Sequence, residues 1–397
     1  MLKISRDEGF TITELLVATS ILLLVIGAVL TTFKNAVQIN DTAAQLGDST
    51  QNLRAGTNLL IRDLMMAGRV FGAEGVALPT CAGAQRFVRP GPTAGFFNTV
   101  QVDTDETGAA VQSTLNLPSI TTGYQLGPSI KGSPTDVVTI MTVDEFTPSI
   151  NAQPTVSRNT KIEGTIAADG RSITLDPNSP WLVKDSVADT QPLQIGDLVL
   201  VKGQTNALLT VTAVGTSSIS FQDNANDPFH FNQGCNPPNW PMGTVGGMST
   251  TGACPAAVAP STQTCFATPV TLFRAMMITY YVDNTTTPGT PRLTRQVNMF
   301  PSTALAGVVE DLDLTYDLVD GAVNPSAVPS LPWTDNSRTP AITYNSNQIR
   351  KVNVHVGVRS EQISKPTQDF VRNHISTAVD VRSLASVDKY KTTGDIQ

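Results

Sequence analysis

The chain has 397 residues, of which 40% are hydrophobic and 15% are charged, a composition that excludes a disordered chain. The formal net charge of −7 argues against a surface that coats nucleic acid in general. With 26 prolines, 29 glycines and only 6% aromatic residues, the sequence predicts a β-rich body with many turns.

The N-terminus combines a short polar segment with a long apolar one. Residues 1–8 include four charged side chains, Gly9 and Phe10 follow, and Glu14 is then the only charged residue before Lys34. The stretch from Phe10 to Phe33 has about two dozen residues, enough to cross ~30 Å of hydrocarbon as a helix. The segment therefore predicts insertion in a membrane.

Three interpretations of this segment compete. A secretory signal would be cut after the apolar run, but the chain beyond Leu30 continues a helical pattern without a turn signal. A plain transmembrane anchor fits the length and leaves Glu14 unexplained, because an ionised carboxylate in the bilayer costs about 2.5–3.5 kcal/mol. The third interpretation supplies a partner for that carboxylate.

The motif GFTITELLVA, which begins at Gly9, resembles the signal of type IV pilins and pseudopilins. This resemblance implies that prepilin peptidase cuts between Gly9 and Phe10 and that Phe10 becomes the N-methylated first residue. It also implies that Glu14 pairs with the N-terminal ammonium of a neighbouring subunit and sets the register between subunits. The balanced charge of the leader and the polar Thr13 depart from the usual pattern.

The helix is expected to continue well past the membrane. Leucines recur at positions 46, 53, 60 and 64, which makes an amphipathic stripe, and Gly68 is a stop signal. A helix over residues 11–67 would be roughly 85 Å long. Its first half would lie in the membrane or a filament core, and its second half would pack on the domain.

After Gly75 the pattern changes to alternation with period 2, which is typical of strands. Alternate apolar residues predict antiparallel sheet with one solvent face and one face covered by the second half of the helix. The predicted fold class is α+β, with a long N-terminal helix on a mostly antiparallel, β-rich domain with long loops. The predicted strands are 136–143, 172–175, 193–202, 207–214, 217–222, 270–282, 293–297, 308–318, 349–359 and 375–382.

Four cysteines are present: Cys81, Cys235, Cys254 and Cys265. They form no CxxC pair, so disulfides are favoured over zinc if the body lies outside the cytoplasm. A Pro/Gly-rich loop at 232–265 contains three of them and is expected to be a disulfide-held surface loop. Four cysteines allow three pairings, with a weak preference for Cys254–Cys265 and Cys81–Cys235.

A second resemblance covers most of the chain. Segments in order look like the PilW-type minor pilins of type IV pilus assembly; they begin at residues 67, 134, 195, 278, 293, 309, 354 and 379. They include AGR after the helix, IGDLVLV, ITYYV and VEDLDLTY. The long insertions, the cysteine loop above all, depart from a compact minor pilin.

No catalytic constellation stands out, so the sequence indicates a protein that is not an enzyme and has no cofactor. The three histidines are scattered, and no GxSxG, HExxH or SxxK motif occurs. Metal binding is not expected; Asp311, Asp313 and Asp317 are weak calcium candidates on an acidic strand. Basic residues gather in the last fifth of the chain, among them Arg350, Lys351, Arg359, Lys365, Arg372 and Arg382, so nucleic acid is possible as a partner but unsupported.

The resemblances together imply a non-enzymatic minor pilin that primes pilus assembly or forms part of the tip. The expected organisation is a leader (1–9), a transmembrane or filament-core helix (10–33), its amphipathic continuation (34–68) and a periplasmic β-rich domain (69–397). The implied location is the bacterial inner membrane and, after assembly, the pilus and cell surface. The implied partners are other major and minor pilins, prepilin peptidase, the pilus assembly platform and membrane lipids. The alternatives are a type II secretion pseudopilin and a tip adhesin or DNA-uptake component.

Overall fold

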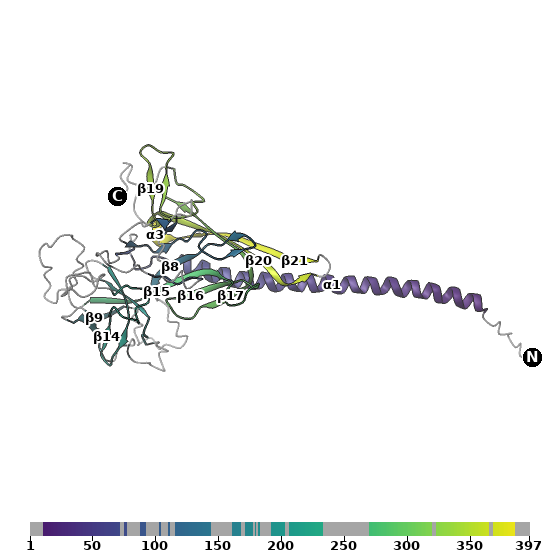
Figure 1. The fold of residues 1–397 in the computed structure, drawn as a ribbon, viewed down its shortest axis with the longest axis horizontal. Coiled ribbons are helices and arrows are strands. Elements are labelled where there is room, and N and C mark those ends of the chain that lie inside the picture. Colours follow the sequence, from purple (N-terminus) through teal and green to yellow (C-terminus); the bar gives the residue numbers. More distant parts are fainter. Residues whose placement is uncertain are drawn as a thin grey trace, which may run out of the picture.

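A long helix leads into a β-rich body at the opposite end of the molecule, as Figure 1 shows for a computed structural model of the chain. The structure describes residues 11–71, 75–77, 88–92, 103–104, 110–111, 116–143, 161–167, 171–177, 179, 182, 192–202, 206–232, 270–319, 323–364 and 368–385.

Helix α1 runs from Ile12 to Met65, close to the predicted 11–67. Thr11 caps its start, because the Thr11 hydroxyl accepts from the Glu14 amide while the Glu14 carboxylate accepts from the Thr11 amide. At the other end Gly68 has a φ of +76°, which only glycine adopts without strain, and its amide donates to the Met141 carbonyl at 3.0 Å. The predicted stop at Gly68 is therefore confirmed, and it joins the helix end to the sheet.

The described part of the chain forms one 13-stranded sheet in which every pairing is antiparallel. Its main path is β13-β14-β10-β9-β15-β16-β17-β20-β21, with β11 and β8 also paired to β15, β12 to β11 and β5 to β8. The bounds are β5 (Ile120–Thr121), β8 (Val138–Val143), β9 (Lys161–Ile166), β10 (Ser172–Thr174), β11 (Leu198–Lys202), β12 (Asn206–Thr210), β13 (Ala213–Val214), β14 (Ser218–Ser220), β15 (Val270–Asp283), β16 (Arg292–Val297), β17 (Thr303–Leu318), β20 (Ile349–Ser364) and β21 (Asp369–Asp380).

The remaining described elements are short. Four two-stranded ladders pair β1 with β4, β2 with β3, β6 with β7 and β18 with β19. Their bounds are β1 (Val76–Ala77), β2 (Asp103–Thr104), β3 (Ala110–Val111), β4 (Asn116–Leu117), β6 (Ser129–Ile130), β7 (Ser133–Pro134), β18 (Trp333–Asp335) and β19 (Ile342–Tyr344). A 3₁₀ turn, η1 (Ser346–Gln348), and a one-turn helix, α3 (Arg382–Ala385), complete the set.

Strand β15 belongs to two packing units. Its first half pairs with β9 and β11, and its second half pairs with β8 and β16. Strands β12 and β13 do not pair with each other, but only two residues of the chain separate them. Through this connection, the pairings of β15 with β11, β11 with β12, β13 with β14, β14 with β10, β10 with β9 and β9 with β15 close a ring, which we call the small barrel. This barrel has its own buried core, which includes Val199, Val201, Leu209, Ile219 and Leu272.

The second half of α1 covers the larger of the two packing units, which contains β16, β17 and β20. Leu53, Leu60 and Leu64 are buried against the inward side chains of β17, β20 and β16, whose alternation was predicted. Gly56 permits a close approach, since a Cβ there would lie 3.1 Å from the Ala306 Cβ. The α+β class and the helix-covered face of the sheet are thus confirmed.

The bounds of three predicted strands were wrong. The predicted strand 193–202 starts only at Leu198, because Gly196 has a φ of +92° and the Asp197 amide donates to the Gln194 carbonyl in a turn. Strands β17 and β20 extend beyond the predicted 308–318 and 349–359, because their pairing with β16 and β21 continues past the alternating apolar residues.

Candidate functional site: the exposed helix and its junction with the sheet

The first half of α1 is long, apolar and uncovered. It is the one helix among the described residues that is long and apolar enough to cross a membrane, and none of its most apolar 18-residue window is buried. Large apolar side chains are exposed from Ile12 to Ile39, and Figure 1 shows this half extending away from the body. An exposed apolar surface of this extent requires lipid or other helices to cover it.

Glu14 lies in the first turn of this uncovered half. Its carboxylate accepts from the Thr11 amide at 3.1 Å and from the Thr11 hydroxyl at 2.9 Å. The carboxylate is exposed, so these contacts leave it open to a further partner. Gly9 and Phe10, the predicted cleavage and methylation positions, lie outside the described residues.

The second half of α1 is fixed to the sheet by a buried charge. Asp63 lies on the buried face of the helix, and its Oδ2 accepts from the Tyr280 hydroxyl at 2.6 Å and from Arg295 Nε at 2.7 Å. Burial and the neighbouring Asp63 carboxylate raise the pKa of Tyr280. Burial opposes the charge of Arg295, but the Asp63 carboxylate outweighs it and raises the pKa of Arg295. The contacts join α1 to β15 and β16.

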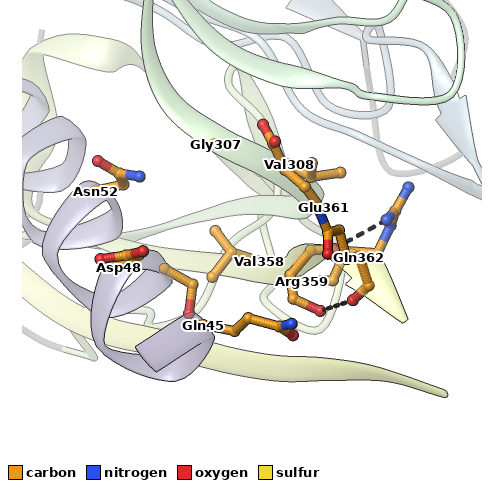
Figure 2. A pocket seen from close by; sticks show the side chains of 11 residues that line it. Gln45, Asp48, Asn52, Gly307, Val308, Val358, Arg359, Glu361 and Gln362 are labelled. Carbon is orange, nitrogen blue, oxygen red and sulfur yellow. Dashed lines mark hydrogen bonds between the residues drawn. The ribbon is translucent and has the colours of Figure 1, made fainter. Parts of the chain in front are cut away.

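A polar groove separates α1 from the tip of the β20–β21 hairpin. Figure 2 shows side chains of α1, among them Gln45, Asp48 and Asn52, projecting towards β17 and β20. The groove consists of two cavities of about 340 Å³ each, which share Gln45, Asp48 and Gln362. The second cavity follows the helix back to Asp41. At its far end the Thr42 and Ser364 hydroxyls are hydrogen-bonded at 3.1 Å, so the hairpin tip contacts the helix there.

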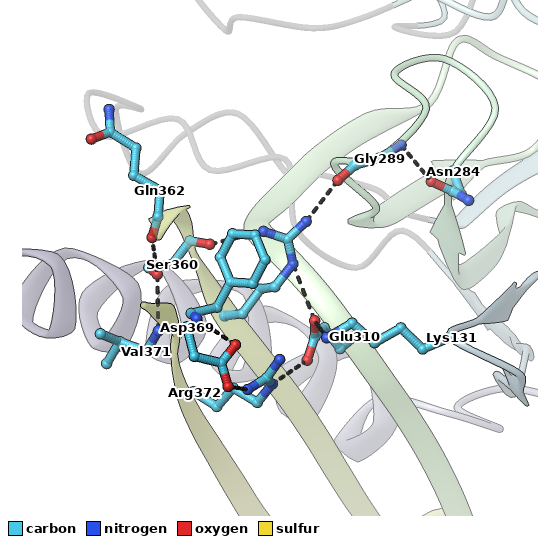
Figure 3. A network of polar contacts seen from close by, with 11 residues as sticks. Lys131, Asn284, Gly289, Glu310, Ser360, Gln362, Asp369, Val371 and Arg372 are labelled. Atoms are coloured by element: carbon cyan, nitrogen blue, oxygen red, sulfur yellow. Dashed lines mark hydrogen bonds and ion pairs between the residues drawn. The ribbon is translucent and has the colours of Figure 1, made fainter. Parts of the chain in front are cut away.

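Beside the groove, a charge network centres on Glu310 of β17 (Figure 3). Its carboxylate binds Lys131, Arg359 at 3.1 Å and Arg372 at 2.9 Å. The Arg359 guanidinium also stacks over the Phe370 ring at 3.9 Å. Burial acts to raise the pKa of Glu310, but Lys131 and Arg372 outweigh it and hold that pKa below its usual value. The network ties β17, β20 and β21 to the β6–β7 turn.

The three acidic calcium candidates lie on the other face of the same strands. Asp311 Oδ2 is 3.6 Å from His355 Nε2, while Asp317 accepts from Asn353 at 3.0 Å. Burial and the charge of Asp311 raise the pKa of Asp313. Across the described residues, no three His, Cys, Asp or Glu side chains group so as to hold a metal ion. The calcium hypothesis therefore gains no support from this face.

The cysteine predictions cannot be compared with the structure. Cys81, Cys235, Cys254 and Cys265 lie outside the described residues, as does all of the 232–265 loop except Asn232. The Asn232 side chain is buried, donates to the Thr210 carbonyl at 2.7 Å and accepts from the Thr210 amide at 3.0 Å. The start of the loop is thus fixed to the barrel.

Sequence reasoning missed the residues that join the helix to the sheet. No sequence motif singles out Asp63, and Tyr280 and Arg295 simply lie within the predicted strands 270–282 and 293–297. One signal was present: Asp63 lies next to Leu64 and three residues after Leu60, which places a charge on the apolar face. The groove acids, Asp41 and Asp48, carried no comparable signal.

Comparison with known proteins adds no relative, since no protein-family model, no curated protein and no solved structure matches this chain.

Proposed function

We propose that the protein is a non-enzymatic, pilin-like structural subunit, most similar to a PilW-type minor pilin of a type IV pilus. One observation carries this proposal: a carboxylate, Glu14, begins an uncovered apolar half-helix whose other half is built into a folded domain. A simple anchor needs no such carboxylate, whereas a subunit that assembles through its helix does.

The energetic argument concerns the partner of Glu14. An ionised carboxylate inside hydrocarbon costs about 2.5–3.5 kcal/mol unless a cation accompanies it. Cleavage after Gly9 would create an ammonium at Phe10 that supplies such a cation from a neighbouring subunit. The capping contacts with Thr11 hold the Glu14 carboxylate at the start of the helix, where that ammonium would lie.

The mechanism is positional rather than chemical. The uncovered half of α1 packs in the membrane and then among the helices of other pilins. The buried Asp63 contacts make the second half of α1 rigid with the sheet, so the domain follows the helix when the helix is assembled. The acidic face of β17 and β20, opposite α1, would then lie on the outside of the assembly.

The small barrel favours a tip position as a second candidate role, such as adhesion or DNA uptake. It is built on the first half of β15 and lies at the end of the body opposite the N-terminus (Figure 1). The small barrel is not needed for packing of the helices, and in a subunit at the tip it would expose a surface beyond the end of the filament. A type II secretion pseudopilin remains the nearest alternative, because it shares the same N-terminal motif.

N-terminal mass spectrometry of the protein from its native membrane tests the class. A chain that begins at methylated Phe10 is the expected result, and a chain that begins beyond Leu30 would exclude a pilin. Replacing Glu14 with alanine should abolish recovery of the subunit in sheared filaments while it remains in the membrane fraction. Glu163→Ala, at an exposed position of β9, is the matched control. Normal assembly of Glu14→Ala would refute the charge-pairing argument.

A further inference from the structure

The groove between α1 and the β20–β21 hairpin carries negative charge, and the α1 residues that line it include no cation. From residue 35 to residue 53, α1 contains two charged side chains, Asp41 and Asp48. They are seven residues apart, so they lie on the same face of the helix, and both line the groove. Both are exposed, and neither takes part in an ion pair among the described residues.

The cations of the opposite wall are already bound elsewhere. Arg359 lines the groove with its aliphatic part, but its guanidinium donates to the Gly289 carbonyl at 2.7 Å and binds Glu310 (Figure 3). Arg292 pairs with Glu361 on the rim at 3.2 Å. The groove therefore keeps the charge of its two helix aspartates.

The polar atoms that line the groove are mainly acceptors. Gln45 lines both cavities, and its Oε1 atom is buried without a hydrogen-bond partner. A buried acceptor without a donor is unfavourable, so a donor that enters the groove is favoured by this contact as well as by charge. A cavity of about 340 Å³ has room for one long cationic side chain. The chemistry points to a lysine or an arginine.

The same helix offers that side chain on a second copy. Lys34 lies seven residues before Asp41, is exposed, and makes no ion pair within the described residues. Two copies of α1 inserted in the same direction and displaced by about 10 Å, or seven residues, bring Lys34 of one level with Asp41 of the other. The Glu14–Phe10 pairing of the proposed function requires a displacement in the same sense, of four residues or about 6 Å, because it sets residue 10 of one copy level with residue 14 of its neighbour. The long Lys34 side chain spans the remaining three residues, about 4.5 Å along the axis.

We infer that this groove binds Lys34 of a second copy of the chain, with Asp41 and Gln45 as the acceptors and Asp48 adding to the negative potential of the groove. The inference rests on the proposed function, because it requires parallel helices that pack side by side. The contact joins two different surfaces of the subunit, so it can repeat from copy to copy and extend an assembly rather than close a dimer.

The first experiment maps the contact by photo-crosslinking. The full-length chain carries a photoreactive residue in place of Ala44, an exposed residue that lines the groove beside Asp41 without being one of its acceptors. Equal amounts of isotopically light and heavy copies are mixed in detergent micelles, where no bilayer fixes the relative depth of the helices. Mass spectrometry should find light–heavy adducts to the peptide around Lys34. Adducts to another part of the chain, or within one copy alone, would overturn the inference.

The second experiment reverses the charges. Lys34→Glu alone and Asp41→Lys with Asp48→Lys should each reduce the intermolecular adduct about two- to fivefold, the range of exposed ion pairs. All three changes together should restore it, and raised salt should weaken the original pair. Equal adduct yields in all variants would overturn the inference. Because the changed residues are exposed, the variants should unfold at the same temperature as the original chain.

A second crosslinker position separates failure of the inference from failure of the proposed function. Val25 lies in the uncovered apolar half of α1, away from the groove. Intermolecular adducts from position 25 without adducts from position 44 would mean that helices pack but the groove is not used. Absence of adducts at both positions would count against helix-mediated assembly itself.

Discussion

The buried carboxylate of Asp63 gives the sharpest test of how the helix is held. The Asp63 side chain is 1% exposed and accepts hydrogen bonds from the Tyr280 hydroxyl and from Arg295 Nε. The Arg295 side chain is 20% exposed. Replacing Asp63 with alanine leaves the Arg295 guanidinium without its anion and the Tyr280 hydroxyl without its acceptor. Breaking a buried ion pair in this way costs about 3–5 kcal/mol. Because Arg295 can regain some water, we expect the lower end, about 3 kcal/mol.

The loss is measured as the free energy of unfolding of the full-length chain in detergent, by urea titration. Hydrogen exchange of the α1 amides between Leu53 and Met65 should speed up in parallel, since the contact holds that part of the helix on the sheet. Asp41→Ala is the matched control, an exposed aspartate on the same helix, and should change stability by about 0.5 kcal/mol or less. If Asp63→Ala were no more damaging than Asp41→Ala, the anchoring role of the buried pair would be wrong.

Two further predictions concern the sheet. Burial raises the pKa of Asp136 to about 7, so the folded state favours the protonated form of this carboxyl group. The free energy of unfolding that Asp136 contributes is therefore lost as pH rises from about 4 to about 7. In urea titrations across that pH range, the free energy of unfolding of Asp136→Asn should depend less on pH than that of the original chain. An unchanged dependence would refute the raised pKa of Asp136. In the Glu310 network, Arg359→Ala should lower the free energy of unfolding by about 1–3 kcal/mol, because Arg359 is nearly buried and stacks on a ring. Arg372→Ala, at a side chain 44% exposed, should lower the free energy of unfolding by less than Arg359→Ala. Equal losses for the two variants in thermal and urea unfolding would contradict this ranking.

Local regularities made the main elements of the fold predictable. The apolar run and the leucines at 46, 53, 60 and 64 follow the helical period, and the structure has one helix from Ile12 to Met65. The valines from Val352 to Val358 follow the strand period, and they are buried in β20 as expected. The residues that make up each pattern lie within a few positions of one another in the chain, so the sequence alone is enough to recognise each pattern.

The small barrel was not predicted, because strand pairing between distant segments leaves no local trace. β15 reads as one continuous strand, yet its two halves belong to different packing units. Nothing in its residue pattern marks the change of partners near Ala275. Whether the barrel closes depends on which distant segments pair with β15, and their packing against one another determines this.

For the candidate site, the sequence by itself determined that an apolar helix carries one carboxylate at its start, because hydrophobicity and charge are properties of single residues. Only the tertiary structure decided which residues hold that helix on the sheet and which groove its second half forms with the sheet. Asp63 meets Tyr280 and Arg295 across 217 and 232 residues of chain, and at the groove Thr42 meets Ser364 of β20 across 322 residues. Side chains so far apart come together only when the helix lies on the closed sheet, since the contact energy depends on the fold and not on sequence distance.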